Sequence, residues 1–531
     1  MGTWNPLANP PGFAASTMLL LTDGTVMVNA DSSRHWSRLT PDSSGSYRNG
    51  TWSSLPDSIN ARLYYDSAVL ADGRVLVAGG EYSDGTGTWS QDWTGKAEIY
   101  DPVANTWSAI GAPPFGKIGD AAACLLADGR LLVGDVFSRS TAIYDPVTSA
   151  WSSTGSSTYL SNEASWVLLQ DDSVLNVTCY SPPQAERYVP SSSSWVSAGS
   201  TPDGLVDLPL KEFGPIVTLP DGRAFVVGGT GRTALYTPPS TTTGTGTWAT
   251  GPDILDTDGT MLTAKDAPAC LLPNGRVLLL VGPAGAGGWS SASRFVEFDG
   301  TSIARIADPT NAGNVTYVGR LLLVGTGEVL FSDGSGTITI YTPDAGFDAA
   351  WKPSIVSCPG NVQLGQTYTL MGRQLNGLSQ AAMYGDDVQT ATNYPLVRAQ
   401  STATGAVSYW RTANHSTMGI GTGAAQVSTT FTVPSTFPEG TYSVVVVANG
   451  IPSDPVTVTV DAGTGQATYL LIDRHFGGGA VLWAYAGGSW HGKSVSEEDL
   501  SGIAQDLFAA NRVDAYWSGS DLTLVRGWKN S

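Results

Sequence analysis

The stretch SAVLADGRVLVAGG, residues 67–80, consists of two apolar runs joined by Asp72 and Gly73. An Asp-Gly or Asn-Gly pair provides the positive φ of a tight hairpin turn, so this stretch predicts two antiparallel strands. Closely similar stretches occupy residues 123–135, 216–229 and 269–282. The hairpin therefore returns at intervals of roughly 45 residues, which is the length of a propeller blade.

A second hairpin follows the first in several units. It carries a Tyr and a Trp at a constant spacing, as in Tyr100 and Trp107 or Tyr144 and Trp151. Two hairpins make the four strands of a blade. Units begin near residues 13, 62, 117, 161, 210, 262 and 315. We therefore predict a mainly β protein with a seven-bladed kelch β-propeller over residues 1–351.

The pattern changes after the propeller. Residues 352–460 contain short apolar or alternating runs between turn residues, which predict an immunoglobulin-like β-sandwich. A Gly/Thr-rich linker, 461–467, leads to residues 468–531. We predict this last segment as a small α+β unit of ββαββ order, with a helix that follows Ser496 in a Ser-x-x-Asp capping pattern.

Composition narrows the classes of partner. The 531 residues carry a net charge of −19, which argues against nucleic acid or an anionic membrane. No apolar run approaches the ~18–20 residues of a membrane span. Residues 1–12 have neither a charged start nor an apolar core, so we expect no signal peptide in this chain. The Ser/Thr-rich, Lys-poor composition favours a secreted or cell-surface protein.

A kelch propeller followed directly by an immunoglobulin-like domain resembles the galactose oxidase family of copper-radical oxidases, and in particular uncharacterised bacterial kelch proteins described as galactose-oxidase-like. The resemblance covers about residues 10–460, and segments 61–73 and 383–398 carry local matches. It implies that Arg62 helps to hold a sugar. It also implies that the segment 383–398 threads to the propeller axis, where Gln389 occupies the place of a copper ligand.

The copper-radical chemistry of that family needs two His ligands, a Tyr cross-linked to Cys, and an axial Tyr next to a His. The place of the Tyr-His pair is taken here by Gly119 and Asp120, and the place of the loop His by Gln389. None of the four histidines of the chain follows a Tyr. Copper(II) prefers imidazole nitrogen, so we expect the copper-radical site to be absent, assign no metal ligand and no cofactor, and leave calcium open.

Acidic residues recur at the entry of the predicted innermost strands. Asp120, Glu163 and Asp266 each stand eight residues before the turn residue, Glu212 one place further out, and Asp66 two places nearer. Innermost strands line the axis of a propeller, so we expect these carboxylates to converge. Three interpretations stay open: pairing with the neighbouring basic residues, a calcium-like site, or a pocket in which crowded carboxylates bind or act on a polyol. The neighbouring basic residues are Arg62, Lys117, Lys211 and Lys265.

Three further residues are candidates for substrate binding. Trp89 and Trp289 lie in Gly/Ser-rich insertions outside the blade pattern, where exposed aromatic faces commonly stack on sugars. His415 lies in a polar loop of the predicted sandwich, although an exposed loop histidine is the simpler interpretation. The recurring Trp residues such as Trp107 are expected to pack within blades.

We therefore expect a galactose-oxidase-like protein without the copper-radical site, which binds or processes a carbohydrate, a polyol or another small polar ligand at the axial face. The alternatives are a metal-free or calcium-assisted hydrolase or lyase, a kelch interaction scaffold with a protein partner bound through residues 468–531, and a copper-radical oxidase. Whether the protein is an enzyme is left open. The predicted catalytic residues are Asp120, Glu163, Glu212 and Asp266, and the predicted substrate-binding residues are Arg62, Asp66, Lys265, Trp89, Trp289, Gln389 and His415.

Overall fold

A computed structural model describes most of the chain. The described residues are 2–83, 90–202, 204–285, 288–384, 390–461, 463–466, 469–474, 480–486, 489–508, 510, 512–518 and 521–528. Sheets dominate them, with one α-helix and three short 3₁₀ turns, η1 (Pro190–Ser192), η2 (Thr316–Val318) and η3 (Ala349–Trp351). Among these residues, no helix has the length and apolar character needed to cross a membrane.

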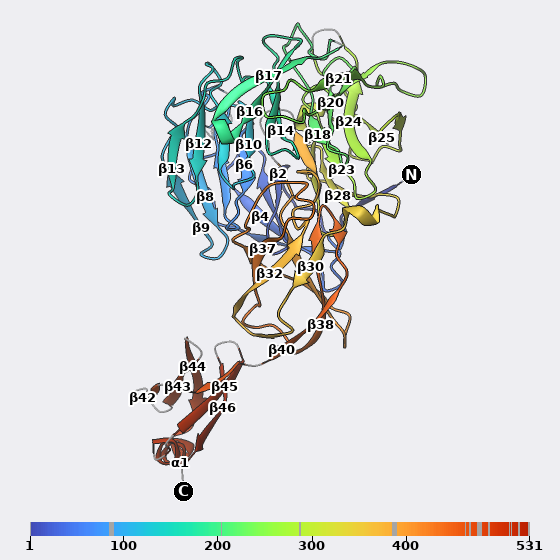
Figure 1. The fold of residues 1–531 in the computed structure, drawn as a ribbon. Coiled ribbons are helices and arrows are strands. Elements are labelled where there is room, and N and C mark those ends of the chain that lie inside the picture. Colours follow the sequence, from blue (N-terminus) through green and yellow to red (C-terminus); the bar gives the residue numbers. More distant parts are fainter. Residues whose placement is uncertain are drawn as a thin grey trace.

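The described residues of the propeller form seven blades of four antiparallel strands, as predicted (Figure 1). Blades 1 to 3 comprise β2 (Ala15–Leu20), β3 (Val26–Ala30), β4 (Trp36–Thr40) and β5 (Thr51–Ser54); β6 (Asp66–Val69), β7 (Val75–Ala78), β8 (Ala97–Asp101) and β9 (Thr106–Ile110); and β10 (Ala123–Leu125), β11 (Leu131–Gly134), β12 (Thr141–Asp145) and β13 (Ala150–Ser153). Blades 4 and 5 comprise β14 (Ser165–Leu168), β15 (Val174–Val177), β16 (Gln184–Val189) and β17 (Ser194–Ser200); and β18 (Ile216–Thr218), β19 (Ala224–Val227), β20 (Thr233–Thr237) and β21 (Thr247–Thr250).

The last two blades are built partly from distant segments. Blade 6 contains β23 (Pro268–Leu271), β24 (Val277–Pro283), β25 (Arg294–Phe298) and β26 (Ile303–Arg305), with the short β22 (Leu262–Thr263) on β24. Blade 7 contains β27 (Arg320–Leu323), β28 (Val329–Ser332) and β29 (Ile338–Thr342), and its outermost strand is the N-terminal β1 (Thr3–Pro6). This pairing closes the ring, and the Trp4 ring packs 4.7 Å from that of Tyr341.

Local chemistry explains the regular blades. Gly73 adopts a φ of 84° in the inner hairpin turn of blade 2, and Asp72 accepts hydrogen bonds from the backbone N–H and the side chain of Arg74. In the outer hairpin, Tyr100 lies opposite Trp107 with 5.2 Å between their ring centroids. The recurring Tyr-Trp pairs are therefore packing residues of the blades, as expected.

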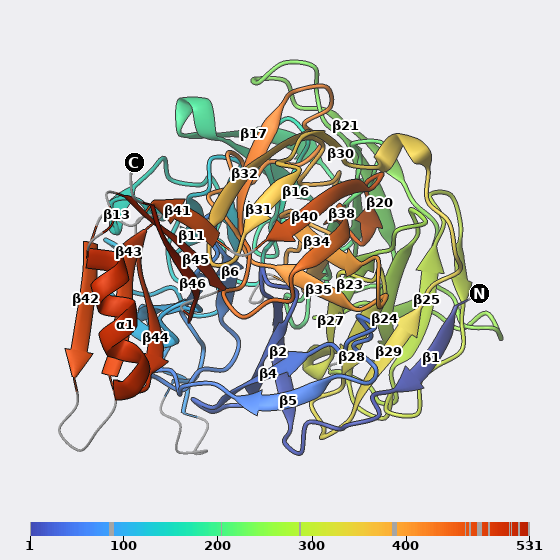
Figure 2. The same cartoon turned by 90° about the horizontal axis from the view of Figure 1, so that it is seen from below.

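Residues after the propeller form a two-sheet β-sandwich. One sheet contains β30 (Ser354–Ser357), β32 (Thr367–Arg373), β37 (Val427–Thr432) and β36 (Thr412–Ala413); the other contains β31 (Asn361–Gln363), β40 (Val456–Asp461), β38 (Gly440–Ala448), β34 (Leu396–Ser401) and β35 (Val407–Trp410), with β39 (Ile451–Pro452) on β38. The two sheets enclose a core of their own around Trp410 and Phe431. Figure 2 shows the sandwich in front of the centre of the ring.

The sandwich covers the end of the propeller that carries the inner hairpin turns. The backbone N–H of His415 donates to Ala71 and that of Met418 to Ala127, each next to such a turn. One segment of the sandwich domain, β33 (Ala382–Tyr384), enters the propeller and pairs antiparallel with β23 of blade 6. It also contacts the innermost strands β18 and β27, so the sandwich contributes a strand to the axis.

The C-terminal unit has a separate core and differs from the predicted ββαββ order. It contains β41 (Gly463–Gln466), β42 (Tyr469–Arg474), β43 (Ala480–Ala486), β44 (Ser489–Val495), α1 (Glu497–Phe508), β45 (Arg512–Ser518) and β46 (Asp521–Trp528), in the sheet order β41-β45-β46-β44-β43-β42. The predicted linker thus contributes a strand, and β44 is an additional strand before the helix. The capping prediction is confirmed, because the backbone N–H of Asp499 donates to the Ser496 hydroxyl at 3.1 Å.

Candidate functional site

The predicted acidic residues lie at the end of the propeller axis that faces away from the sandwich. The innermost strands are β2, β6, β10, β14, β18, β23 and β27, and innermost strands of neighbouring blades contact one another around the axis, as β23 and β27 do. Asp120, Glu163, Glu212 and Asp266 precede these strands, whereas the turns that follow the strands meet the sandwich. The strand β33 runs toward the same end, since Tyr384 pairs with Pro268 while Ala382 pairs with Cys270.

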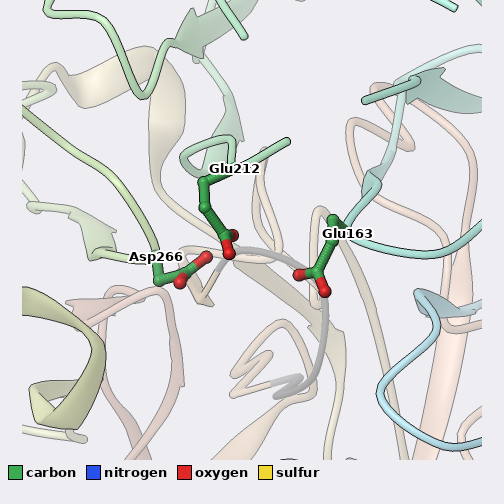
Figure 3. Close-up of side chains that lie close together, drawn as sticks. All are labelled: Glu163, Glu212 and Asp266. Atoms are coloured by element: carbon green, nitrogen blue, oxygen red, sulfur yellow. The ribbon is translucent and has the colours of Figure 1, made fainter. Parts of the chain in front are cut away.

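Three of these carboxylates form a compact group, which we call the axial trio: Glu163, Glu212 and Asp266. One carboxylate oxygen of each lies within 4.8 Å of those of the other two. Figure 3 shows the three side chains, from blades 4, 5 and 6, with their carboxyl groups directed toward one another. The prediction that acidic residues of different blades converge at the axis is therefore confirmed for these three.

Backbone contacts between blades 5 and 6 bring Glu212 and Asp266 together. The backbone N–H of Asp266 donates to Phe213 at 2.8 Å, and Glu212 forms an isolated bridge with Asp207. The Asp207 carboxylate pairs in turn with the buried ammonium group of Lys265. Lys265, at the start of blade 6, is thus joined to the loop of blade 5 that carries Asp207. This contact helps to position Glu212 and Asp266.

Burial and crowding make the site unfavourable for several ionised carboxylates. The pKa of Asp266 is raised well above its usual range, first by burial and then by the charge of Glu212. Burial, followed by the charge of Glu81, raises the pKa of Asp120 to about 7. Asp120 is 8% exposed. The site therefore combines carboxyl groups whose pKa values are raised with a high density of acidic side chains.

The basic neighbours have partners outside the axial trio. Lys265 pairs with Asp207 and donates to the carbonyl of Gly288 at 3.0 Å. The Lys211 ammonium lies 4.0 Å from the centroid of the Tyr180 ring. Arg62 forms a buried ion pair with Glu98 at 2.8 Å. Lys265 also acts on the trio through its charge, which opposes part of the rise in the pKa of Asp266.

Aromatic side chains connected by ring contacts border this end of the propeller. Trp289 lies 5.3 Å from Tyr317, which lies 6.3 Å from Tyr64, and Tyr64 lies 6.2 Å from Tyr82. All four rings are partly exposed. The Lys265 ammonium is 5.7 Å from the Trp289 ring centroid. This arc of rings therefore extends to the Lys265–Asp207 ion pair next to Asp266.

Two predicted substrate-binding residues lie inside blade 2. The Arg62 side chain, 3% exposed, donates to the carbonyls of Gly79 and Lys96 in addition to its ion pair with Glu98. Asp66 is buried at the start of β6. The structure thus gives Arg62 the role of a buried structural cation, and we leave it out of the proposed binding site.

His415 lies at the opposite end of the propeller, and not at the axial site where we expected it. Its backbone N–H donates to Ala71 at 3.0 Å, and Nδ1 hydrogen-bonds with the Thr429 hydroxyl at 2.9 Å. The imidazole is buried where the sandwich covers blade 2. Two other predicted residues, Trp89 and Gln389, lie outside the described residues.

Sequence reasoning missed several residues of the axial end. Tyr64 stands eight residues before Asp72, the position of Asp120, Glu163 and Asp266 in their blades, so the pattern could have found it. Glu81 and Tyr180 share a second position, nine residues after the turn residue. The partner of Lys265, Asp207, carries no such signal because it lies in the variable loop before β18.

The donor groups that the structure describes at this end do not fit a copper-radical centre. Of the described histidines, His35 is exposed beside Asp57, His415 lies at the junction with the sandwich, and His491 stacks on Trp517 in the C-terminal unit. Within the part of the chain that the structure describes, the axial end thus offers carboxylates and no imidazole. Copper(II) takes imidazole nitrogen in such sites, so these donors suit a harder ion.

Comparison with solved structures relates this fold to that of an oxidase. A fungal alcohol oxidase of the AA5 family, in complex with copper, superimposes with a TM-score of 0.52 at 15% sequence identity, over 86% of this chain and 99% of the oxidase. The chain has a galactose-oxidase-like fold. At this identity the similarity extends to the architecture alone.

A second structure, a catalytically inactive virginiamycin B lyase from Staphylococcus aureus with quinupristin, matches with a TM-score of 0.45 at 9% identity, over 65% of this chain and 100% of the lyase. No protein-family model and no curated protein matches the sequence.

Proposed function

We propose that the protein binds a carbohydrate or another polyol at the axial end of the propeller, through a site of galactose-oxidase-like architecture whose chemistry rests on carboxylates and not on a copper radical. The observation that carries the proposal is the axial trio, in which three blades each place a carboxylate oxygen within 4.8 Å of the other two. Carboxylates accept hydrogen bonds from hydroxyl groups, which are the groups that a polyol offers in number.

The aromatic arc supports the same ligand class. Trp289, Tyr317 and Tyr64 present partly exposed rings in mutual contact at the end of the axis where the trio lies. Aromatic faces next to convergent polar groups are the usual composition of a small-molecule site. A sugar ring can stack on such a face while its hydroxyls reach the carboxylates.

Binding of a glycan panel to the full-length protein tests the proposal, followed by calorimetry with each hit. Glu212→Gln and Trp289→Ala are expected to weaken binding at least about tenfold, a loss of about 1.4 kcal/mol. Trp490→Ala is the matched control, because Trp490 is an exposed aromatic residue of the C-terminal unit. Loss of binding in Trp490→Ala alone would place the sugar site in that unit and refute the proposal.

A hydrolase is a second candidate, favoured by one observation. The pKa of Asp120 is raised to about 7, which suits a general acid at neutral pH. The trio supplies carboxylates that could act as the second catalytic group, as nucleophile or as base. Turnover of aryl glycosides that disappears in Asp120→Asn, with binding preserved, would support this candidate.

A further inference from the structure

We propose that the axial trio binds one hard divalent cation, Ca²⁺ in preference to Mg²⁺, and that hydroxyl oxygens of the polyol complete the coordination of this ion. The inference deepens the proposed function and rests on it for the identity of the outer ligands. The cation site itself rests on the geometry of the trio and on Asp120.

The spacing of the trio matches the size of calcium. Two oxygens bound to one Ca²⁺ at about 2.3–2.6 Å are at most about 4.6–5.2 Å apart. The oxygens of Glu163, Glu212 and Asp266 lie within 4.8 Å of one another, which is compatible with three ligands of one such ion. Mg²⁺ demands near-ideal octahedral geometry and usually keeps several waters, whereas Ca²⁺ accepts six to eight oxygens in flexible geometry, so a site of three carboxylates from different blades favours Ca²⁺.

A fourth carboxylate gives an independent indication that a ligand belongs here. Asp120 is 8% exposed, and its Oδ1 has no hydrogen-bond partner among the described residues. It occupies the blade position of Glu163 and Asp266, eight residues before the turn, and its charge acts on Asp266. A buried carboxylate oxygen without a partner is costly, and a cation, or a water bound to it, supplies that partner.

The charge distribution also favours a cation. Lys265, the basic residue nearest to Asp266 in the sequence, is turned toward Asp207, and Lys211 lies over Tyr180. Three carboxylate oxygens within 4.8 Å of one another concentrate negative charge at this point of the axis. A divalent ion offsets this concentration of negative charge directly.

The coordination number leaves room for a ligand. Ca²⁺ takes six to eight oxygens, and three carboxylates supply between three and six, depending on whether each binds through one oxygen or two. The remaining positions suit a pair of neighbouring hydroxyl groups on a polyol. The Trp289 ring, 5.7 Å from the Lys265 ammonium, offers such a ligand a face on which to stack.

Calorimetric titration of the full-length protein with CaCl₂ and with MgCl₂, after removal of metal by a chelator, tests the cation site. We expect one Ca²⁺ per chain, weaker binding of Mg²⁺, and at least about a tenfold loss of Ca²⁺ affinity in Glu212→Gln and in Asp266→Asn.

Asp172→Asn is the matched control. Asp172 is an acidic residue with a positive φ of 64°, like Asp266, and the neighbouring carboxylates of Asp171 and Asp128 likewise help to raise its pKa, but it follows the inner strand of blade 4 at the opposite end. Absence of Ca²⁺ binding in the wild-type protein would overturn the inference, and so would an equal loss in Asp172→Asn. Circular dichroism checks that each variant is folded.

Sugar binding measured with Ca²⁺ and with chelator separates this inference from the proposed function. Binding that needs Ca²⁺ supports both. Equal binding with and without chelator overturns the cation inference and leaves the proposed function standing. Ca²⁺ binding at the trio without any polyol ligand supports the cation site, overturns the role of the polyol as an outer ligand, and counts against the proposed function.

Discussion

Acidification should weaken the junction between the sandwich and the propeller, because His415 is buried there in its neutral form. The imidazole is 7% exposed and lies parallel to the Tyr394 ring, with 6.2 Å between the ring centroids. Burial lowers the pKa of His415 from 6.5 to about 4, and the Asp72 carboxylate opposes this effect only in part. The unfolded chain therefore takes up a proton at a higher pH than the folded protein does.

The sign and the magnitude follow from linkage. The folded-state pKa lies below the unfolded value, so the contribution of His415 to stability is complete above about pH 6.5 and is lost as the pH falls toward 4. A pKa difference of one corresponds to about 1.4 kcal/mol, so the loss amounts to about 3 kcal/mol at pH 4. Other titrating groups add their own contributions, which a matched variant removes by subtraction.

His415→Gln is that variant, because a glutamine amide can still hydrogen-bond with Thr429 but does not titrate. Guanidinium unfolding of both proteins, followed at pH 7 and at about pH 4, should show a loss about 3 kcal/mol larger in the wild-type protein. NMR titration should show one imidazole signal with a pKa near 4 that is missing in the variant. Equal losses in the two proteins, or a signal that titrates near 6.5, would refute the reasoning.

Two further substitutions probe the axial end and blade 2. Asp266→Asn should raise Tm at pH 7 in calcium-free buffer and leave it unchanged near pH 3. The reason is that the folded-state pKa of Asp266 lies above the unfolded value, so ionisation of this residue is costly only above about pH 4. Calorimetric scans at both pH values check this, and a lower Tm at pH 7 would contradict it. Arg62→Met should cost about 3–5 kcal/mol in denaturant unfolding, since it leaves the buried Glu98 carboxylate without its ion-pair partner; a variant as stable as the wild-type protein would show that the pair contributes little.

Much of the fold was predictable because each blade repeats the same local chemistry. Asp72 and Gly73 form their turn through contacts within a few residues, and the Tyr100–Trp107 pair forms across one hairpin. Such features depend on neighbouring residues and can be recognised in a single sequence. The strand β33 was not predictable in the same way, because its pairing with β23 joins segments more than 100 residues apart.

The axial site shows where sequence reasoning stops. The position eight residues before the turn placed Glu163 and Asp266 at one end of the axis, since equivalent positions in a ring of blades face the same way. The distance between their carboxylates depends on two further features, a positive φ at each of these residues and the Asp207–Lys265 contact between adjacent blades.

The repeat pattern predicts neither the positive φ nor the Asp207–Lys265 contact. Non-glycine residues rarely adopt positive φ, and the loop that carries Asp207 varies between blades. His415 illustrates the reverse case. Its loop is polar in sequence, yet the propeller buries the imidazole, so burial by a second domain turned a candidate ligand into a part of the junction. A site formed between blades thus depends on residues that deviate from the repeat, and their effect on its geometry is visible only in the closed ring of blades.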